Sequence, residues 1–243
     1  MSRVAVVTGG ASGMGLGAAR HLRDAGNRVA ILDLGTDRVG PVADREGFLG
    51  IVCDVSDRVA VDAAMGRVRS ELGPVQILVT SAGIEGTVKF LEMSFETWQK
   101  VIDVNLNGTF HCIQSALPDM VEAGWGRIVT ISSSSAQSGA PDRAHYIASK
   151  GGVIALTKAI SYDFAPLGIT CNTIPPSIID TPMAREGEKK GSTPIPLDMI
   201  RDLTPVRRLG TADDIGATVA FLCSDAGGFI TGQQIGVNGG WYV

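Results

Sequence analysis

Paired cysteines are missing from this sequence. Its four cysteines are far apart and lie within apolar stretches, and none belongs to a CxxC pair: Cys53, Cys112, Cys171 and Cys223. Such cysteines are typical of buried free thiols in a reducing compartment, so we expect a cytoplasmic protein without disulfides. Only three histidines are present, and none has a metal-binding spacing such as HExxH. The sequence therefore predicts no metal site.

Basic runs and long apolar runs are missing as well. Lys and Arg total 21 against 25 Asp and Glu, which gives a formal net charge of −4. A nucleic-acid partner, which would need clustered positive charge, is not expected. No stretch of about 18 apolar residues exists to cross a membrane, and the first apolar run is too short for a signal peptide. We therefore expect a soluble protein whose partner is neither a membrane nor a nucleic acid.

The sequence is rich in glycine, with 31 residues, and alternates short β-rich runs with helical patterns. We expect strands at residues 3–8, 28–33, 50–55, 75–80, 127–132, 169–174 and 233–237. We expect helices at residues 16–25, 146–165 and 212–223. A further helix is expected from a cap at Ser56 or Asp57 to residue 72, and another begins after a cap at Ser94. Strands that are apolar on both faces and separated by helices indicate a parallel sheet with both faces covered. The sequence predicts one α/β domain over residues 1–243, a Rossmann-like doubly wound sheet of about seven strands with helices on both faces.

Residues 182–210 interrupt this alternation. The segment is polar and contains two glycines and three prolines, at Gly187, Gly191, Pro194, Pro196 and Pro205. Excursions of this length are usually functional lids or poorly ordered segments, and we expect a lid over the substrate. The lid carries five basic residues that can meet an anionic substrate such as a coenzyme A thioester, or can simply be solvated: Lys189, Lys190, Arg201, Arg207 and Arg208.

A glycine-rich turn follows the first expected strand. Residues 8–15 read Thr-Gly-Gly-Ala-Ser-Gly-Met-Gly and lead into a helix. Glycine lets the backbone bend sharply and approach a pyrophosphate, which the free N–H groups and the dipole of a helix N-terminus attract. By itself the TGxxxGxG spacing is weak evidence, because such turns also occur without a ligand. We expect the turn to bind a dinucleotide through Gly9, Ser12, Gly13, Met14 and Gly15.

Asp33 ends the second expected strand about 20 residues after the turn. A carboxylate there accepts hydrogen bonds from the adenosine ribose hydroxyls and repels a 2′-phosphate. No Arg or Lys stands in the turn or directly after Asp33 and Leu34, and the nearest is Arg38. The pattern favours NAD over NADP. Asp54 can reach the adenine amino group together with the Val55 backbone, although a helix cap is the alternative role of Asp54.

Tyr146 and Lys150 form a YxxxK motif at the start of an expected helix. Positions i and i+4 share a helix face, so the phenol and the ammonium project side by side. A tyrosine has an ordinary pKa of about 10, and we expect the adjacent cation, with the charge of a bound nicotinamide, to lower that pKa. Tyr146 can then take the proton of an alcohol or return one to an alkoxide. YxxxK also arises often by chance.

Four consecutive serines lie at 132–135, after an expected strand. They either form a simple turn, or one of them supplies a hydroxyl group that holds the substrate oxygen near Tyr146.

Taken together, these motifs resemble those of the short-chain dehydrogenase/reductase family in its single-domain form. The resemblance covers essentially the whole chain, from TGxxxGxG at Thr8 through YxxxK at Tyr146 to Asn-Gly-Gly at 238–240. It implies an enzyme that transfers a hydride between NAD(H) and a secondary alcohol or its ketone, with Tyr146 as the general acid and base.

The same resemblance implies further site residues. Ser133, which lies 13 residues before the tyrosine, matches the catalytic serine, and Asn105 matches the asparagine that kinks a helix and relays protons through water. Lys150 matches the lysine that holds the nicotinamide ribose. The remaining cofactor contacts are expected at Ser81, Ala82, Gly83, Pro176, Ile179 and Thr181.

Two departures from the family pattern bear on the pocket. The family's Asn-Asn-Ala-Gly reads Thr-Ser-Ala-Gly at 80–83, and its Pro-Gly reads Pro176-Ser177, preceded by Pro175. The first change replaces an asparagine contact on the adenosine side with a serine. The second stiffens the backbone beside the nicotinamide, and we expect it to alter the pocket but not the chemistry.

The resemblance leaves the substrate open. Carrier-protein reductases of the family place arginines where this chain has Gly124 and Leu167, so we favour a free secondary alcohol or ketone. A 3-oxoacyl-ACP or 3-hydroxyacyl-CoA type reductase or dehydrogenase is the alternative, and a non-catalytic NAD-binding regulatory protein is less favoured because the catalytic residues are present. A sugar epimerase would need a longer C-terminal region. The family also implies a homotetramer, paired through apolar residues of two long helices: Phe110, Ile113, Leu117, Ile154, Ile160 and Phe164.

Overall fold

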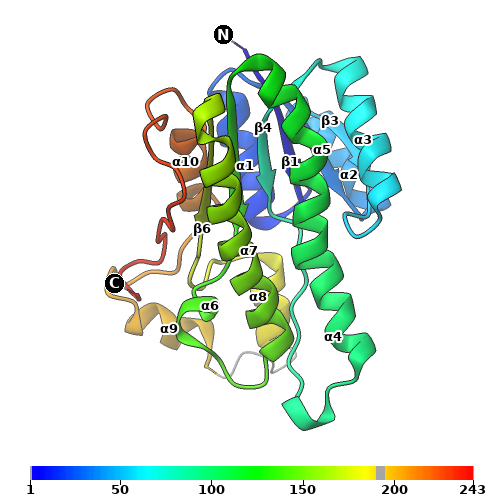
Figure 1. The fold of residues 1–243 in the computed structure, drawn as a ribbon. Coiled ribbons are helices and arrows are strands. Elements are labelled where there is room, and N and C mark those ends of the chain that lie inside the picture. The colour runs from blue at the N-terminus through cyan, green and yellow to red at the C-terminus, as the bar shows by residue number, and fades with distance from the viewer. Residues whose placement is uncertain (1, 190–194, 243) are drawn as a thin grey trace.

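A parallel sheet lies at the centre of the molecule (Figure 1). The computed structural model describes residues 2–189 and 195–242. The strands are β1 (Val4–Thr8), β2 (Arg28–Asp33), β3 (Leu49–Val52), β4 (Val75–Thr80), β5 (Gly126–Ile131) and β6 (Ile169–Ile174). Their order across the sheet is β3-β2-β1-β4-β5-β6, and all pairs are parallel. The order reverses between β1 and β4, and ligands of such sheets bind in the crevice at the carboxyl ends of the strands at that point.

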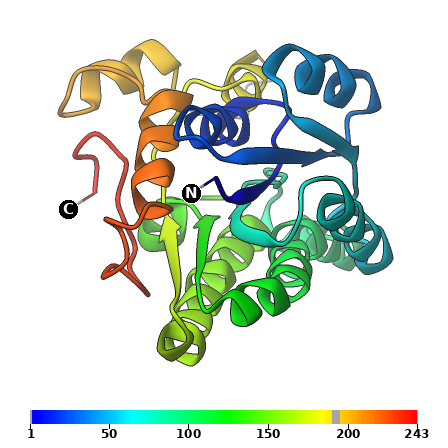
Figure 2. The same cartoon turned by 90° about the horizontal axis from the view of Figure 1, so that it is seen from above.

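Helices cover both faces of the sheet, as the view from above shows (Figure 2). One face packs against α1 (Gly13–Asp24), α2 (Thr36–Glu46) and α10 (Ala212–Leu222). The other packs against α3 (Arg58–Glu71), α5 (Gly108–Ala123) and α7 (Ala144–Phe164). Alternate strand residues enter the two apolar cores, so the strands are buried from both sides. The predicted doubly wound α/β fold is confirmed.

The sheet has six strands rather than the seven that we expected. Residues 233–237 make only an isolated bridge to β6, between Gln234 and Thr173. The Thr173 N–H donates to the Gln233 carbonyl over 2.9 Å, and the Ile235 N–H donates to the Thr173 carbonyl over 2.9 Å. The next donor in a parallel ladder would be the N–H of residue 175, which is a proline and has none. The ladder therefore stops after one bridge.

Sequence patterning also missed α2, whose interior contains Gly40 and Pro41. Elsewhere the predicted elements agree within a few residues. The α3 cap is Asp57, whose carboxylate accepts the N–H groups of Val59 and Ala60, and Ser94 caps α4 (Phe95–Ile102) by accepting the Thr97 N–H. No helix in the part of the chain described is long and apolar enough to cross a membrane.

Residues 182–210 contain two short helices, α8 (Pro182–Lys189) and α9 (Leu197–Leu203). Both lie below the carboxyl ends of the strands in Figure 1. The short helix α6 (Ser135–Ser138) precedes α7. The expected lid residues Lys190, Gly191 and Pro194 lie outside the described residues.

Candidate active site

The glycine-rich turn after β1 packs against the loop after β4. The Thr8 hydroxyl accepts the N–H groups of Ser81 and Ala82 over 3.2 and 3.1 Å. Gly9 has a positive φ of 64°, and a Cβ there would lie 2.9 Å from the Ala82 Cα. A Cβ at Gly15 would lie 2.2 Å from the Gly9 carbonyl oxygen. These glycines are required because backbone occupies the space of a side chain.

The start of α1 faces the loop that follows β6. Ser12 is the N-cap but its side chain makes no capping hydrogen bond, and the first turn, with Met14, contains no acidic residue. A Cβ at Gly13 would lie 3.5 Å from the Thr181 Cγ2. The turn, the helix N-terminus and Thr181 thus surround one space, and the N–H groups of the first helical turn can bind an anion there.

The loop after β6 is held from two sides. The Pro176 carbonyl accepts the Ser134 N–H over 3.0 Å. Ile179 is buried and forms a bridge with Gly210, at the end of the lid segment. Pro176, Ile179 and Thr181 therefore lie along one fixed loop beside the turn.

The carboxylate of Asp33 lies at the end of β2 and reaches the turn. It accepts the Ala11 N–H over 3.1 Å and the Gly35 N–H over 3.3 Å. Leu34 beside it is exposed. The Arg38 side chain lies next to Gly35, because a Cβ at Gly35 would be 2.7 Å from the Arg38 Nε. An acidic group thus lies at the position where the sequence predicts binding of the adenosine ribose.

Asp54 makes a local turn rather than a helix cap. Its carboxylate accepts the N–H and the hydroxyl of Ser56 over 2.9 and 2.7 Å. Val55 is buried, and its carbonyl contacts Nδ1 of His111 over 3.1 Å. Asp54 and Val55 lie one strand beyond Asp33 in the sheet.

Asn105 is buried in a π-helical turn, η2 (Asp103–Asn107), between α4 and α5. Its amide clamps the backbone of Ile84, accepting the N–H over 2.8 Å and donating to the carbonyl over 2.9 Å. It also donates to the Ser149 hydroxyl over 3.0 Å. The extra residue of a π turn is what allows the amide to leave the helix and reach the neighbouring loop.

Lys150 is 6% exposed, and its ammonium donates to the Ile131 carbonyl over 2.8 Å. Burial lowers its pKa to about 8. Gly83 faces the same point, because a Cβ there would lie 3.2 Å from Asn105 Oδ1 and 3.4 Å from Lys150 Nζ. The structure therefore brings Gly83, Asn105 and Lys150 together.

Tyr146 is partly buried, one turn before Lys150 on α7, and the lysine Nζ lies 5.9 Å from the centre of its ring. Burial raises the pKa of Tyr146, and a hydrogen bond with the Ser133 hydroxyl opposes that rise. We expected Lys150 to lower this pKa. In the protein by itself burial is the largest effect on this pKa, and the Lys150 ammonium donates its hydrogen bond to the Ile131 carbonyl instead.

The four serines after β5 have different partners. The Ser132 hydroxyl bonds the Ile174 carbonyl, whereas Ser134 and Ser135 turn the chain into α6. The Ser133 hydroxyl accepts the Ser135 N–H over 3.2 Å, and it is the serine that lowers the pKa of Tyr146. The structure thus places beside Tyr146 the serine that the resemblance indicated.

The residues present fit a nicotinamide dinucleotide. The buried ammonium of Lys150, beside the side-chain-free Gly83, can donate to the hydroxyls of a ribose. The open N-terminus of α1 matches a pyrophosphate, and the carboxylate of Asp33 matches a second ribose. These three points follow the crevice from β2 to the start of α7. No group of residues that could hold a metal ion is found among those described.

Sequence reasoning missed an ion pair at this site. Arg143 Nη1 lies 3.6 Å from Glu85 Oε2, with side chains 19% and 29% exposed. Both charges act on the pKa of Tyr146, Glu85 raising it and Arg143 lowering it. The two residues are far apart in the chain and belong to no motif, so only the fold brings them together.

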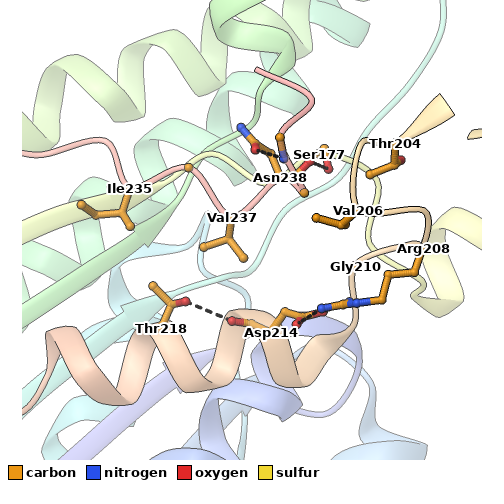
Figure 3. A pocket seen from close by; sticks show the side chains of 13 residues that line it. Ser177, Thr204, Val206, Arg208, Gly210, Asp214, Thr218, Ile235, Val237 and Asn238 are labelled. Atoms are coloured by element: carbon orange, nitrogen blue, oxygen red, sulfur yellow. Dashed lines mark hydrogen bonds and ion pairs between the residues drawn. The ribbon is translucent and has the colours of Figure 1, made fainter. Parts of the chain in front are cut away.

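A separate cavity of about 410 Å³ lies between the end of the lid, α10 and the C-terminal segment (Figure 3). Its polar side chains bind one another: Arg208 pairs with Asp214 over 2.6 Å, and the Ser177 hydroxyl donates to the Asn238 carbonyl over 3.2 Å. The Val206 N–H donates to the Gly239 carbonyl. These contacts fix the base of the lid to the rest of the molecule.

The family model described as enoyl-(acyl carrier protein) reductase matches residues 9–242. The chain belongs to the short-chain dehydrogenase/reductase family. It is therefore an oxidoreductase that binds a nicotinamide cofactor.

Several relatives match along their whole length. An acetoacetyl-CoA reductase of Rhizobium meliloti (strain 1021) is 40% identical over 243 residues, 100% of this chain and 99% of the relative. A 2-dehydro-3-deoxy-L-rhamnonate dehydrogenase (NAD(+)) of Sphingomonas sp. (strain SKA58) is 37% identical over 240 residues, 98% of this chain and 94% of the relative. Among solved structures, the ligand-free aldohexose dehydrogenase of Thermoplasma acidophilum has a TM-score of 0.91 at 33% identity, covering 98% and 93% of the two chains.

Proposed function

We propose that this short-chain dehydrogenase/reductase interconverts a secondary alcohol and its ketone, with Tyr146 exchanging the proton of the substrate oxygen. The observation that supports it most is the meeting of Tyr146, Ser133, Lys150 and Asn105 at the carboxyl ends of β4 and β5. When bound, the nicotinamide supplies the hydride acceptor or donor.

Each of these side chains has a part that its contacts support. The Ser133 hydroxyl holds the substrate oxygen beside the phenol. Lys150 places a positive charge one helical turn away, which favours the phenolate once its ammonium is also engaged with a ribose. Asn105 fixes the loop at Ile84 and, through the Ser149 hydroxyl, the start of α7. It thereby positions the loop that carries Gly83.

We infer that the cofactor is NAD. The carboxylate of Asp33 accepts the Ala11 N–H of the turn, which places it beside the expected ribose, where it would repel a 2′-phosphate. The adjoining cofactor contacts follow the predicted residues, from the turn at Gly9–Gly15 through Ser81–Gly83 to Pro176–Thr181. We infer that the lid, whose described residues are 182–189 and 195–210, covers the substrate side of the same crevice.

The quaternary structure and location follow from exposed residues and thiols. We infer a homotetramer, which would cover Phe110 on α5 and Tyr162 on α7, 42% and 87% exposed. Ile113 and Leu117, expected at that contact, are buried in the core of the chain itself. The cysteines are free and buried, which supports a cytoplasmic location.

The test is NADH formation from NAD, run in parallel with NADP, over secondary alcohols, hydroxy acids and 3-hydroxyacyl thioesters. The Tyr146→Phe variant should lose turnover by at least about a thousandfold and bind NADH within a few-fold of the wild type. Turnover that survives in this variant would refute the assigned acid and base. Preference of the wild type for NADP would refute the assignment of Asp33.

A further inference from the structure

The ion pair between Glu85 and Arg143 lies at the mouth of the site, and both residues are adjacent in the chain to segments that carry the proposed catalytic residues. Glu85 follows Ile84, whose backbone is held at both ends by the Asn105 amide. Arg143 is the N-cap residue of α7, three residues before Tyr146. The pair therefore borders the space in front of the phenol, where the substrate carbon skeleton must lie.

The two side chains keep hydrogen-bonding capacity for a ligand. Their 3.6 Å separation exceeds the 2.7–3.2 Å of an N–H···O hydrogen bond. This contact therefore leaves carboxylate oxygens able to accept and guanidinium N–H groups able to donate. The pair brings equal numbers of positive and negative charges, so it favours neither an anion nor a cation. A hydroxyl group, which both donates and accepts, satisfies both partners.

The arginines in the described part of the lid are already bonded within the protein, so they are not free to attract an anionic substrate. Three of them pair with neighbouring carboxylates over 2.6 to 2.9 Å: Arg185 with Asp180, Arg201 with Asp202, and Arg208 with Asp214. Arg201 and Arg208 are among the residues that the sequence offered for an anionic substrate. A phosphate or carboxylate on the substrate would have to displace these partners. The segment between β5 and α7 is polar as well, since α6 reads Ser-Ala-Gln-Ser.

We propose that Glu85 and Arg143 select the substrate by binding a hydroxyl group next to the reacting carbon, so that the enzyme acts on neutral polyhydroxylated substrates of the alditol and aldose class. The inference rests on the proposed oxidoreductase function. The Glu85 carboxylate accepts a hydrogen bond from the neighbouring hydroxyl, and Arg143 donates to its oxygen. An analogue without that hydroxyl displaces water from both side chains without replacing the hydrogen bonds that the water made. A site built to bind a substrate hydroxyl discriminates strongly against such an analogue.

The test uses substrates that differ by one hydroxyl. Butane-2,3-diol is compared with butan-2-ol, and D-glucose with 2-deoxy-D-glucose; 3-hydroxybutyryl-CoA represents the acyl thioesters. The measured quantity is the ratio of kcat/KM within each pair. The Glu85→Leu/Arg143→Met variant removes the pair at unchanged net charge. Glu85→Gln/Arg143→Gln retains donors and acceptors, and is the fallback should the apolar variant fold poorly. The control is Arg67→Met/Glu71→Leu, an exposed ion pair on α3.

In the wild type and in the control, the hydroxylated member of a pair should be preferred at least about tenfold, the value of one hydrogen bond to a charged group. The ratio should fall toward one in the apolar variant and to an intermediate value in the Gln variant. A wild type that turns over the thioester or butan-2-ol as well as the diol would overturn this inference and leave the proposed function standing.

Binding provides a readout that does not need turnover. Saturation-transfer NMR on the enzyme with NADH should show butane-2,3-diol and D-glucose contacting the wild type and not the apolar variant. If that pattern is found while no compound is oxidised, the inference stands and the proposed function fails. If neither binding nor turnover of the hydroxylated compounds is seen, the inference is overturned.

Discussion

The buried charge of Lys150 reduces the stability of this protein, and the structure sets the size of the effect. The ammonium lies within the protein with a carbonyl as its hydrogen-bond acceptor, and burial lowers its pKa from the ordinary value of 10.5 to about 8. A pKa difference of this size corresponds to about 3 kcal/mol of destabilisation at pH 7. Lys150→Met removes that cost at similar volume, but leaves the Ile131 carbonyl without its donor, at about 1 to 3 kcal/mol.

We therefore expect Lys150→Met to be as stable as the wild type at pH 7, or up to about 2 kcal/mol more stable, while turnover is lost. The pH dependence is the sharper signature. Between pH 8 and 10.5 the unfolded lysine holds its proton and the folded one does not, so the wild type gains stability as the pH rises. The variant lacks this gain. The free energy of unfolding of the variant, relative to that of the wild type, should therefore fall by about 2 kcal/mol between pH 7 and pH 9.5.

The assay is urea unfolding of both proteins at pH 7, 8.5 and 9.5, at equal concentration because assembly contributes to stability. Loss of the hydrogen bond to the Ile131 carbonyl changes the free energy of unfolding of the variant by the same amount at every pH. It therefore does not affect how the difference between variant and wild type changes with pH. A difference that stays constant with pH, or that grows in favour of the variant, would refute the assignment of a buried, protonated Lys150.

Three further changes test other parts of the structure. Asp33→Ser should raise the kcat/KM ratio of NADP to NAD by about tenfold or more, because the carboxylate that repels the 2′-phosphate is gone; an unchanged ratio in steady-state kinetics would contradict this. Gly83→Ala places a Cβ 3.2 Å from Asn105 Oδ1, so the neighbours must shift by a few tenths of an ångström. We expect about tenfold lower kcat/KM, with the melting temperature as the control for folding. Glu46 bonds three arginines, and its pKa is lowered to about 2, chiefly by the hydrogen bond from Arg20. Glu46→Gln should reduce the free energy of unfolding at pH 7 by about 1 to 2 kcal/mol after solvent screening, and this difference should vanish as the pH falls from 4.5 toward 2.

The fold was predictable because its signals are local and repeated. Each strand is a continuous apolar run bounded by a glycine, a cap or a polar residue, and each central strand was placed within a residue or two. The helix α2 was missed because Gly40 and Pro41, both poor helix formers, lie inside it and weaken its pattern. The prediction of a seventh strand at 233–237 was wrong for a reason that lies outside those residues. The chain that follows β6 lacks an N–H group at Pro175, so the ladder cannot continue.

The site was predictable only where a motif specifies it. Spacing identified Tyr146 and Lys150, and the resemblance added Ser133 and Asn105, which the structure brings to the same edge of the sheet. The direction of the pKa change at Tyr146 was not predictable, because it depends on how deeply the phenol is buried. The Glu85–Arg143 pair was also inaccessible to sequence reasoning, since it depends on two loops meeting.

The two prolines that follow β6 also affect how this molecule meets others. An outer strand normally offers a row of unpaired N–H and C=O groups to which a strand of another chain can add. Here the molecule's own segment around Gln234 occupies part of that row, and Pro175 and Pro176 have no N–H to offer beyond it. This edge is thus protected against aggregation by strand addition at the place where the chain leaves the sheet to form the cofactor loop.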